Sequence, residues 1–400
     1  MRALRHTLGM TLALLLLGCG GDDSGGNGPP PVGSPAPSPA PTPTPSPTPA
    51  PTPTPTPTPT TSAVTQRIVA SFSNPWAMVF LPDGRLLVTE RQGALFLVTT
   101  AGAKTQVTGV PSVVFANQIG LHDIVLDPSF ATNSRVWLSY AEGASGGQRI
   151  AVASATLNLA GTPALQNLSV VWRSTPATTG GHLAARLAFA PNGNSLFVST
   201  GDRQQGAPAQ DLATTLGKMI RINLDGTPFA GNPFASNPNA RPEIFSYGQR
   251  NPLGIVFAAD GRLFSSEMGP SGGDEFNLIA GGSNYGWPLA SEGNNYDGSL
   301  IPRHATNAAF TAPLVTWSTI APAGIIQYRG TRFAGWTDDF LIAGLVQQGI
   351  VRVRVTGNTA QEVGRIGLGA RIREVEQGPD GRIWVLQDGG TANLVELSPG

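Results

Sequence analysis

One hydrophobic pattern recurs between residues 63 and 400: a short apolar run, a polar turn and a second apolar run. Apolar runs separated by Gly, Pro, Asn and Asp are typical of β-strands joined by tight turns. The pattern therefore predicts a chain of repeated hairpins. In order, the copies are AMVFLPDGRLLVTE (77–90), DIVLDPSFATNSRVWLSY (123–140), RLAFAPNGNSLFVST (186–200), GIVFAADGRLFSSE (254–267), the looser IIQYRGTRFAGWTDDFLIAGL (325–345) and REVEQGPDGRIWVLQD (373–388).

Six copies of one hairpin predict a repeat architecture for residues 63–400. They leave about 56 residues for each copy, enough for four short antiparallel strands and their loops. Sheets of this size, arranged radially, form a β-propeller, so we expect an all-β fold of six four-stranded antiparallel blades. A pair of stacked β-sandwiches is the main alternative, but sandwiches do not repeat one hairpin six times. In a propeller, polar loops beside successive hairpins converge at the axis.

The first residues have the features of a bacterial secretory leader. Arg2 and Arg5 precede an apolar stretch, Met10–Leu17, that is too short to span a bilayer. The sequence LLGC at 16–19 resembles a lipobox, which predicts removal of residues 1–18 and lipidation of Cys19. Ordinary cleavage that leaves a free thiol is the alternative. Cys19 is the only cysteine of the chain, so no intramolecular disulfide can form.

A lipid anchor would hold the protein on the periplasmic side of a membrane. Gly20 stands in place of the aspartate that often retains lipoproteins in the inner membrane, so we expect the outer membrane. Residues 19–62 would form a linker, since the stretch from Pro29 to Thr61 is almost entirely Pro, Thr, Ser and Ala. This composition favours polyproline II and cannot bury a core. A formal net charge of +0 gives no indication of a nucleic-acid partner.

The octapeptide YGQRNPLG (247–254) places an arginine and an asparagine at a rigid corner. Pro252 fixes its own φ and pushes Asn251 into an extended conformation, and a strand-like run follows. A hydrogen-bonded turn would explain these polar residues. The alternative is a site that aims Arg250 and Asn251 at a ligand.

His182 and Asp202 flank the third hairpin copy. His182 lies in the Gly-rich run TTGGHLAARLAF, which leaves the imidazole free to project as a general base. The hairpin returns Asp202, in FVSTGDR, towards His182, so the carboxylate can orient the ring. A packing histidine and a turn-capping aspartate are the alternatives. We expect His122 and His304 to be structural or exposed.

The segment SSEMGPSGGDEFNLIAGGSNYGWP (265–288) is rich in glycine and oxygen donors and holds no Cys or His. Carboxylate and carbonyl oxygens are the ligands that Ca²⁺ prefers, whereas zinc favours nitrogen and sulfur. The segment therefore predicts a calcium site. Solvated loop acids are the alternative for Asp274 and Glu275.

These motifs together resemble the soluble sugar dehydrogenases that use pyrroloquinoline quinone (PQQ), and most closely the aldose or sorbosone dehydrogenase branch. The shared motifs are YGQRNPLG, SSEMGPSGGDEFNLI, SNYGWP, the His182 loop and the TGD hairpin end, in the same order along 63–400. The resemblance implies a six-bladed propeller with PQQ and Ca²⁺ as cofactors. It also implies oxidation of aldose sugars at the anomeric carbon to lactones.

The resemblance also implies roles for individual residues. His182 would be the base for the anomeric hydroxyl, Asp202 its orienting partner and Arg250 a catalytic contact to the quinone. The implied cofactor contacts are Gln118, Arg250, Asn251, Trp317, Thr319, Gln347, Arg371 and Arg373. The implied calcium ligands are the carbonyls of Gly269 and Pro270 near the quinone, and Glu275 and Tyr285 at a second, structural site.

Three of these positions show where the chain agrees with the resemblance and where it departs from it. Arg371 and Arg373 share one face of a predicted strand, and forked guanidinium groups suit the carboxylates of the quinone. Gln347 stands where glucose-oxidising relatives carry a cofactor-binding lysine, which weakens one anionic contact.

The expected function is thus a lipid-anchored sugar dehydrogenase with an electron acceptor that the sequence does not identify. Two alternatives use the same architecture. One is a Ca²⁺-dependent lactone hydrolase, which needs a metal held by side-chain carboxylates at the axis. The other is a non-catalytic propeller that binds a glycan or a protein.

Overall fold

The computed structural model describes residues 60, 61 and 63–400. The expected signal peptide, the lipidation site Cys19 and the linker up to residue 59 lie outside the described residues. The expectations for them stay predictions. Within the described part, no helix is long and apolar enough to cross a bilayer.

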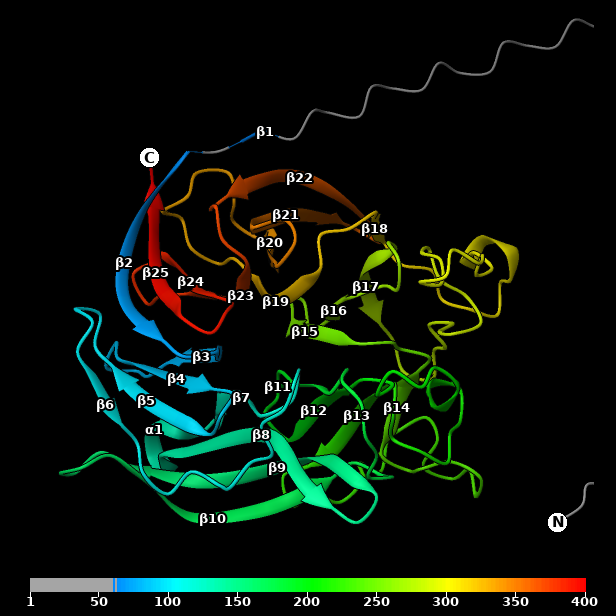
Figure 1. Cartoon of the computed structure of the whole chain (residues 1–400), viewed down its shortest axis with the longest axis horizontal. Coiled ribbons are helices and arrows are strands. Elements are labelled where there is room, and N and C mark those ends of the chain that lie inside the picture. Colours follow the sequence, from blue (N-terminus) through cyan, green and yellow to red (C-terminus); the bar gives the residue numbers. More distant parts are fainter. Residues whose placement is uncertain (1–59, 62) are drawn as a thin grey trace, which may run out of the picture. The chain divides into compact units, whose positions relative to one another are not determined.

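Six antiparallel sheets surround a common axis, as predicted (Figure 1). We number them blades 1 to 6 in chain order. Blade 1 holds β3 (Pro75–Phe80), β4 (Leu86–Glu90), β5 (Ala94–Val98) and β6 (Lys104–Gln106). Blade 2 holds β7 (Leu121–Leu126), β8 (Arg135–Ala144), β9 (Gly147–Asn158) and β10 (Ala164–Arg173). Blade 3 holds β11 (Ala184–Phe189), β12 (Ser195–Thr200), β13 (Lys218–Asn223) and β14 (Ile244–Tyr247).

The second half of the ring repeats this order. Blade 4 holds β15 (Pro252–Phe257), β16 (Leu263–Glu267), β17 (Asp274–Ile279) and β18 (Val315–Trp317). Blade 5 holds β19 (Pro322–Gln327), β20 (Phe340–Gly344), β21 (Gly349–Thr356) and β22 (Thr359–Gly367), with β1 (Thr60–Thr61) parallel to β22. Blade 6 holds β23 (Ile372–Gln377), β24 (Ile383–Gln387), β25 (Ala392–Pro399) and β2 (Val64–Phe72). The described helices are short: α1 (Phe130–Asn133), η1 (Ala207–Ala209) and η2 (His304–Thr306).

The ring is closed by a strand from the opposite end of the chain. β2 pairs antiparallel with β25, from Val64 opposite Pro399 to Phe72 opposite Ala392. Figure 1 shows the two strands side by side, β2 in blue and β25 in red. Closure leaves no free edge at the join between the first and last segments of the domain.

The six hairpin copies of the sequence are the two innermost strands of the six blades. The first strand of each copy lies at the axis, and neighbouring innermost strands contact one another round the ring. The turn of the first copy shows why the pattern folds this way. Gly84 adopts a φ of 85°, which favours glycine, and Asp83 Oδ1 accepts the N–H of Arg85 at 3.0 Å.

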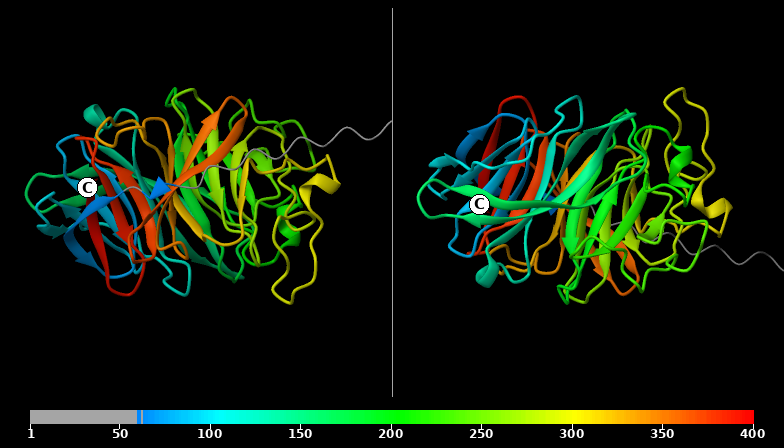
Figure 2. Two further views of the ribbon diagram at one scale, coloured as in Figure 1. Left: turned by 90° about the horizontal axis from the view of Figure 1, so that it is seen from above. Right: turned by 90° about the horizontal axis from the view of Figure 1, so that it is seen from below.

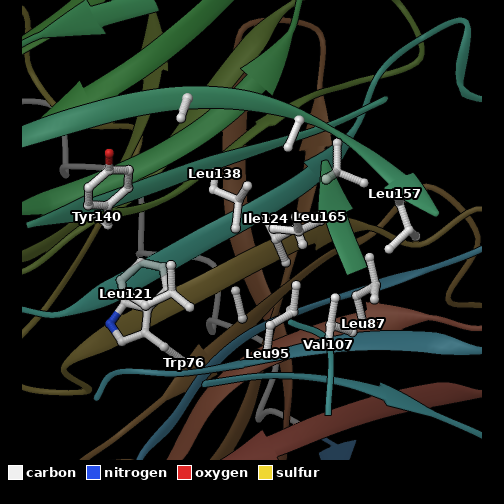
Figure 3. Packing of buried hydrophobic residues seen from close by; sticks show 14 of the residues in the cluster. Trp76, Leu87, Leu95, Val107, Leu121, Ile124, Leu138, Tyr140, Leu157 and Leu165 are labelled. Atoms are coloured by element: carbon white, nitrogen blue, oxygen red, sulfur yellow. The ribbon is translucent and has the colours of Figure 1, made fainter. Parts of the chain in front are cut away.

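Apolar side chains fill the space between neighbouring blades. Between blades 1 and 2, Leu87, Leu95, Ile124, Leu138 and Leu157 pack into one buried cluster (Figure 3). The side views of Figure 2 show the sheets standing next to one another, with loops gathered at the two ends of the axis. This packing fixes the blades relative to one another, so loops from different blades can form one site.

Charged residues occupy the axis itself. Arg186 of β11 donates its Nε to the carbonyl of Leu253 at 2.7 Å, and its Nη1 contacts both Asp123 and Glu374. All three charged side chains are buried. Gly324 leaves room for this network, because a Cβ there would meet Glu374 Oε1 at 1.8 Å. Burial raises the pKa of Glu374 to about 7, although the nearby Arg186 opposes the shift.

Replacing Glu374 with Gln tests the axial network. The Glu374 carboxyl has a pKa of about 7 in the folded protein and an ordinary value of 4.5. The folded state therefore holds more protons in this window, and stability falls as the pH rises through it. Glu374→Gln removes this titration. Between about pH 5 and about pH 8, the variant should lose roughly 1–3 kcal/mol less unfolding free energy than the wild type. Urea unfolding of both proteins at the two pH values measures these free energies. An equal loss in the variant and the wild type would contradict the prediction.

Candidate active site

A cavity of about 340 Å³ lies at one end of the axis. Residues from all six blades and their loops line it, so it exists only in the closed ring. Nine residues predicted for the site lie together on its walls: Gln118, His182, Arg250, Asn251, Gly269, Pro270, Thr319, Arg371 and Arg373.

His182 and Asp202 form a hydrogen-bonded pair beside this cavity. The hairpin of β11 and β12 brings them together, and His182 Nδ1 lies 2.7 Å from Asp202 Oδ1. His182 adopts a φ of 45°, uncommon for a residue with a side chain, and its N–H donates to Gln118 Oε1 at 2.9 Å. The loop is thus held in a conformation that places the imidazole on the cavity wall.

Asp202 is fixed by three further donors. Trp287 Nε1 donates to its Oδ2 at 2.8 Å, and the N–H groups of Gln204 and Gly206 donate at 2.8 and 3.1 Å. Burial alone would raise the pKa of Asp202, but the hydrogen bonds from His182, Trp287 and Gln204 outweigh it and hold the pKa below its usual value. The carboxylate is therefore ionised at neutral pH. It keeps a proton on His182 Nδ1, which leaves Nε2 as the atom that can accept a proton.

The corner at Arg250 and Asn251 is held from behind by Glu267. The Oε1 atom of Glu267 accepts the N–H of Arg250 and, at 3.2 Å, the N–H of Asn251. The N–H of Asp202 donates to the Arg250 carbonyl at 2.9 Å, which joins the corner to the His182–Asp202 pair. The backbone is hydrogen-bonded, and both side chains line the cavity. The turn is therefore hydrogen-bonded through its backbone, and its two side chains are also available to the cavity.

Several buried polar atoms at this corner have no partner in the described structure. They are Arg250 Nε, Asn251 Oδ1 and Glu267 Oε2. An unpartnered buried polar atom costs free energy, so such a cluster indicates a site completed by a ligand or an ion. Arg250 Nη1 meanwhile donates to the Met268 carbonyl at 3.1 Å, and Nη2 donates to Tyr296 Oη at 2.8 Å.

Two buried acids lie directly behind Gly269 and Pro270. Glu267 and Glu275 line a small second cavity together with Gly269, Pro270 and Tyr285. Burial raises the pKa of Glu267 to about 7 and raises the pKa of Glu275 well above its usual value, with Glu267 adding to the second shift. Two buried carboxylates near carbonyl oxygens fit a hard cation, which would relieve their repulsion.

The solvated-acid alternative for Asp274 and Glu275 is wrong, because both side chains are buried. Asp274 Oδ2 accepts the N–H groups of Ile320 and Ala321, each at 2.7 Å, and its Oδ1 accepts the Gly269 N–H at 3.0 Å. Asp274 thus fixes the Gly269 backbone. The Tyr285 hydroxyl donates to the carbonyl of Leu278 in β17 at 2.6 Å, so its proton is engaged in a hydrogen bond within blade 4.

Positive charge gathers on the opposite wall of the cavity. Arg371 Nε and Arg373 Nη2 donate to Asp388 at 2.9 and 2.7 Å. Burial would raise the pKa of Asp388, but the two arginines hold it below its usual value. Arg91 lines the same wall, where burial and Arg373 lower its pKa. One carboxylate faces three guanidinium groups, an excess that fits a ligand with several carboxylates.

Two predicted cofactor contacts, Trp317 and Gln347, lie outside this cavity. Trp317 packs in a buried cluster between blades 4 and 5, and its Nε1 donates to Glu362 at 2.7 Å. The Oε1 atom of Gln347 accepts Nη1 of Arg365 at 2.8 Å. Both side chains are bound by residues of β22, so their positions do not support a contact to a ligand in the cavity.

Sequence reasoning missed Arg91 and Tyr296, which both line the cavity. Arg91 had a usable signal, because it directly follows the second strand of its hairpin copy, as Asp388 does in blade 6. His122 is buried, and it also lines the cavity; its ring nitrogens lie 3.2 and 3.1 Å from the carbonyls of Ala184 and Gln118. It stacks on Trp76, and burial lowers its pKa to about 3. His304 is also buried, with Glu292 at 3.0 Å.

The fold and the site together define a closed six-bladed propeller with a histidine–aspartate pair facing an arginine-lined axial cavity. The sequence model of the Glucose / Sorbosone dehydrogenase family matches residues 72–396, and the chain belongs to this family of sugar dehydrogenases.

Similar proteins agree with this assignment. Aldose sugar dehydrogenase YliI of Escherichia coli is 38% identical over 336 residues, which cover 82% of this chain and 90% of the relative. The apo-form crystal structure of the soluble aldose sugar dehydrogenase from Escherichia coli superposes with a TM-score of 0.81 at 35% identity, over 84% of this chain and 100% of that one. The structure of the PQQ-bound aldose sugar dehydrogenase from Streptomyces coelicolor superposes with a TM-score of 0.69 at 28% identity. The match covers 85% of this chain and 99% of that one.

Calcium should stabilise the protein through the Glu267–Glu275 cavity. At a Ca²⁺ concentration about a hundredfold above Kd, the stabilisation should be about 2–3 kcal/mol, visible as a rise in Tm by scanning fluorimetry. Glu275→Gln should reduce the rise strongly, because it removes half of the anionic charge. Asp260→Asn, which alters an exposed turn acid, is the control. An equal rise in Tm in all three proteins would contradict the assignment.

Proposed function

We propose that the protein oxidises aldose sugars at the anomeric carbon to lactones, with PQQ and Ca²⁺ as cofactors. The observation that carries the proposal is the His182–Asp202 pair on the wall of a cavity with Arg250, Arg371 and Arg373. A proton acceptor and an anion-binding wall are the two things that sugar oxidation by an anionic quinone needs from a protein. The PQQ-bound relative supports the choice of cofactor.

The residues present fit both cofactors. Arg91, Arg371 and Arg373 would hold the quinone carboxylates, since Asp388 offsets only part of their charge. The unpartnered Arg250 Nε and Asn251 Oδ1 would complete their hydrogen bonds in the loaded site. The carbonyls of Gly269 and Pro270 would contact a calcium ion at the quinone, and the nearby Glu267–Glu275 cavity would take a second one.

The chain's own part in the reaction is to hold and move a proton. His182 Nε2 takes the proton of the anomeric hydroxyl as the C1–H bond breaks, and Asp202 stabilises the resulting imidazolium. When bound, the quinone supplies the acceptor for the hydride that leaves C1. Arg250 is placed to stabilise the negative charge that develops on the acceptor side. The proton and the two electrons lost by the sugar are thus accounted for.

The lactone hydrolase alternative gains no support from the cavity. It requires side-chain carboxylates that hold a metal at the axis. Across residues 63–400, no group of three or more His, Cys, Asp or Glu side chains is arranged to hold a metal ion. The cavity wall carries Arg91, Arg250, Arg371 and Arg373, which suit an anionic ligand. These observations favour the dehydrogenase.

The proposal includes attachment to a membrane through Cys19, with the propeller on the periplasmic side. The sequence of residues 1–62 supports it, with its lipobox-like LLGC and its Pro/Thr-rich stretch. Wild-type protein from cells should partition into detergent, whereas Cys19→Ala should partition into water. Recovery of both forms in the aqueous phase would contradict the anchor.

Two variants distinguish the catalytic role of His182 from the cofactor-binding role of Arg371. With Ca²⁺, PQQ, an aldose panel and a dye acceptor, His182→Ala should lose about 10²–10⁴-fold in kcat and keep the quinone affinity of the wild type. Arg371→Ala should instead weaken quinone binding by roughly 10-fold or more. Arg262→Ala, at an exposed turn, is the control.

The same assay decides the proposal as a whole. Wild-type protein that reduces no dye with any aldose, although it binds the quinone, would contradict the proposed function. Unchanged quinone affinity in Arg371→Ala would contradict the cofactor assignment alone.

A further inference from the structure

Tyr296 is the most exposed aromatic residue in the cavity wall. The residue is 77% exposed although it lines the cavity. It lies on the long connection between β17 and β18, the yellow segment beside blade 4 in Figure 1. An exposed aromatic ring at the mouth of a cavity often marks a contact with a ligand.

The base of the loop that carries Tyr296 is rigid. Ser271 and Asn294 exchange backbone hydrogen bonds of 2.9 and 3.1 Å, which join the loop to the segment that contains Gly269 and Pro270. Arg303 donates to the carbonyl of Ser291 at 2.8 Å and to Asn294 Oδ1 at 2.7 Å. The chain around Tyr296 is therefore held at a defined distance from the cavity.

The hydroxyl of Tyr296 is fixed by a residue of the site itself. Arg250 Nη2 donates to Tyr296 Oη at 2.8 Å, and the guanidinium carbon lies 5.7 Å from the centre of the tyrosine ring. On another side, Arg250 lies 5.2 Å from the ring centre of Trp287, which donates to Asp202. One chain of contacts thus connects Tyr296 through Arg250 and Trp287 to the His182–Asp202 pair. The hydroxyl is bound, and most of the residue remains exposed.

We propose that Tyr296 forms the outer wall of the sugar subsite and determines how tightly an aldose binds. This inference rests on the proposed function. An aldopyranose has an apolar face of C–H groups, and an amphipathic aromatic ring with a fixed hydroxyl suits that face. With the anomeric hydroxyl at His182, the far side of the sugar lies towards the cavity mouth, where Tyr296 stands. Tyr296 takes no part in proton or hydride transfer, so it contributes to binding.

The test compares three variants of the protein loaded with quinone and Ca²⁺, with D-glucose as the probe. Tyr296→Ala removes ring and hydroxyl, and KM should rise about 5- to 10-fold while kcat changes less than about twofold. Tyr296→Phe keeps the ring and loses the link to Arg250, so its KM should lie between those of Tyr296→Ala and the wild type. Leu300→Ala is the matched control, because Leu300 is 79% exposed on the same connection and does not line the cavity.

Quinone affinity, titrated by absorption, separates this role from a purely structural one. It should be the same in all four proteins, because a sugar wall does not contact the quinone. An unchanged KM in Tyr296→Ala would overturn the inference. A loss confined to kcat, or a weakened quinone affinity, would also overturn it, since Tyr296 would then act by positioning Arg250.

The proposed function and this inference fail in different ways. If the wild type does not oxidise any aldose, the proposed function fails. D-glucose binding, followed by tryptophan fluorescence, then decides the inference. If Tyr296→Ala binds D-glucose about 5- to 10-fold more weakly and Leu300→Ala binds it as tightly as the wild type, the role of Tyr296 in the sugar subsite is supported. Equal binding, or no binding to any of the proteins, overturns it.

Discussion

The pairing of β2 with β25 closes the ring of six sheets, and every site residue owes its position to that closure. The cavity takes side chains from all six blades, which are separated by up to about three hundred residues in the sequence. At the axis, Arg186 of blade 3 joins Asp123 of blade 2 and Glu374 of blade 6. This buried network crosses the axis and is possible only because the ring is complete.

Glu267 connects the corner at Arg250 and Asn251 to the small second cavity. Its Oε1 atom accepts the N–H groups of Arg250 and Asn251, while its Oε2 atom has no partner in the described structure. Glu267 and Glu275 line the small cavity together. A buried acid pair of this kind is unfavourable unless a proton or a cation compensates it. The folded protein thus holds two uncompensated buried carboxyl groups beside the axial cavity. A bound cation would compensate them and stabilise the corner from behind.

Local sequence rules predicted the elements and some of the site. Turn residues such as Asp83 and Gly84 act within a few positions, so the six hairpins and their number were predictable. The His182–Asp202 contact was predictable as well, because one hairpin brings the two together. The family resemblance implied cofactor contacts for Trp317 and Gln347, whereas their partners in the structure, Glu362 and Arg365, come from β22. Tyr296 was missed for the same reason, since contacts across loops and blades leave no periodic signal in the sequence.

The central claim is that His182 and the arginine-lined cavity together make a sugar-oxidising quinoprotein. The most direct test is an anaerobic titration of the protein reconstituted with PQQ and Ca²⁺ by an aldose, followed in the absorption spectrum. The account predicts that one equivalent of sugar reduces the bound quinone fully and is recovered as lactone. A quinone that binds in the cavity and is reduced by no aldose would contradict it.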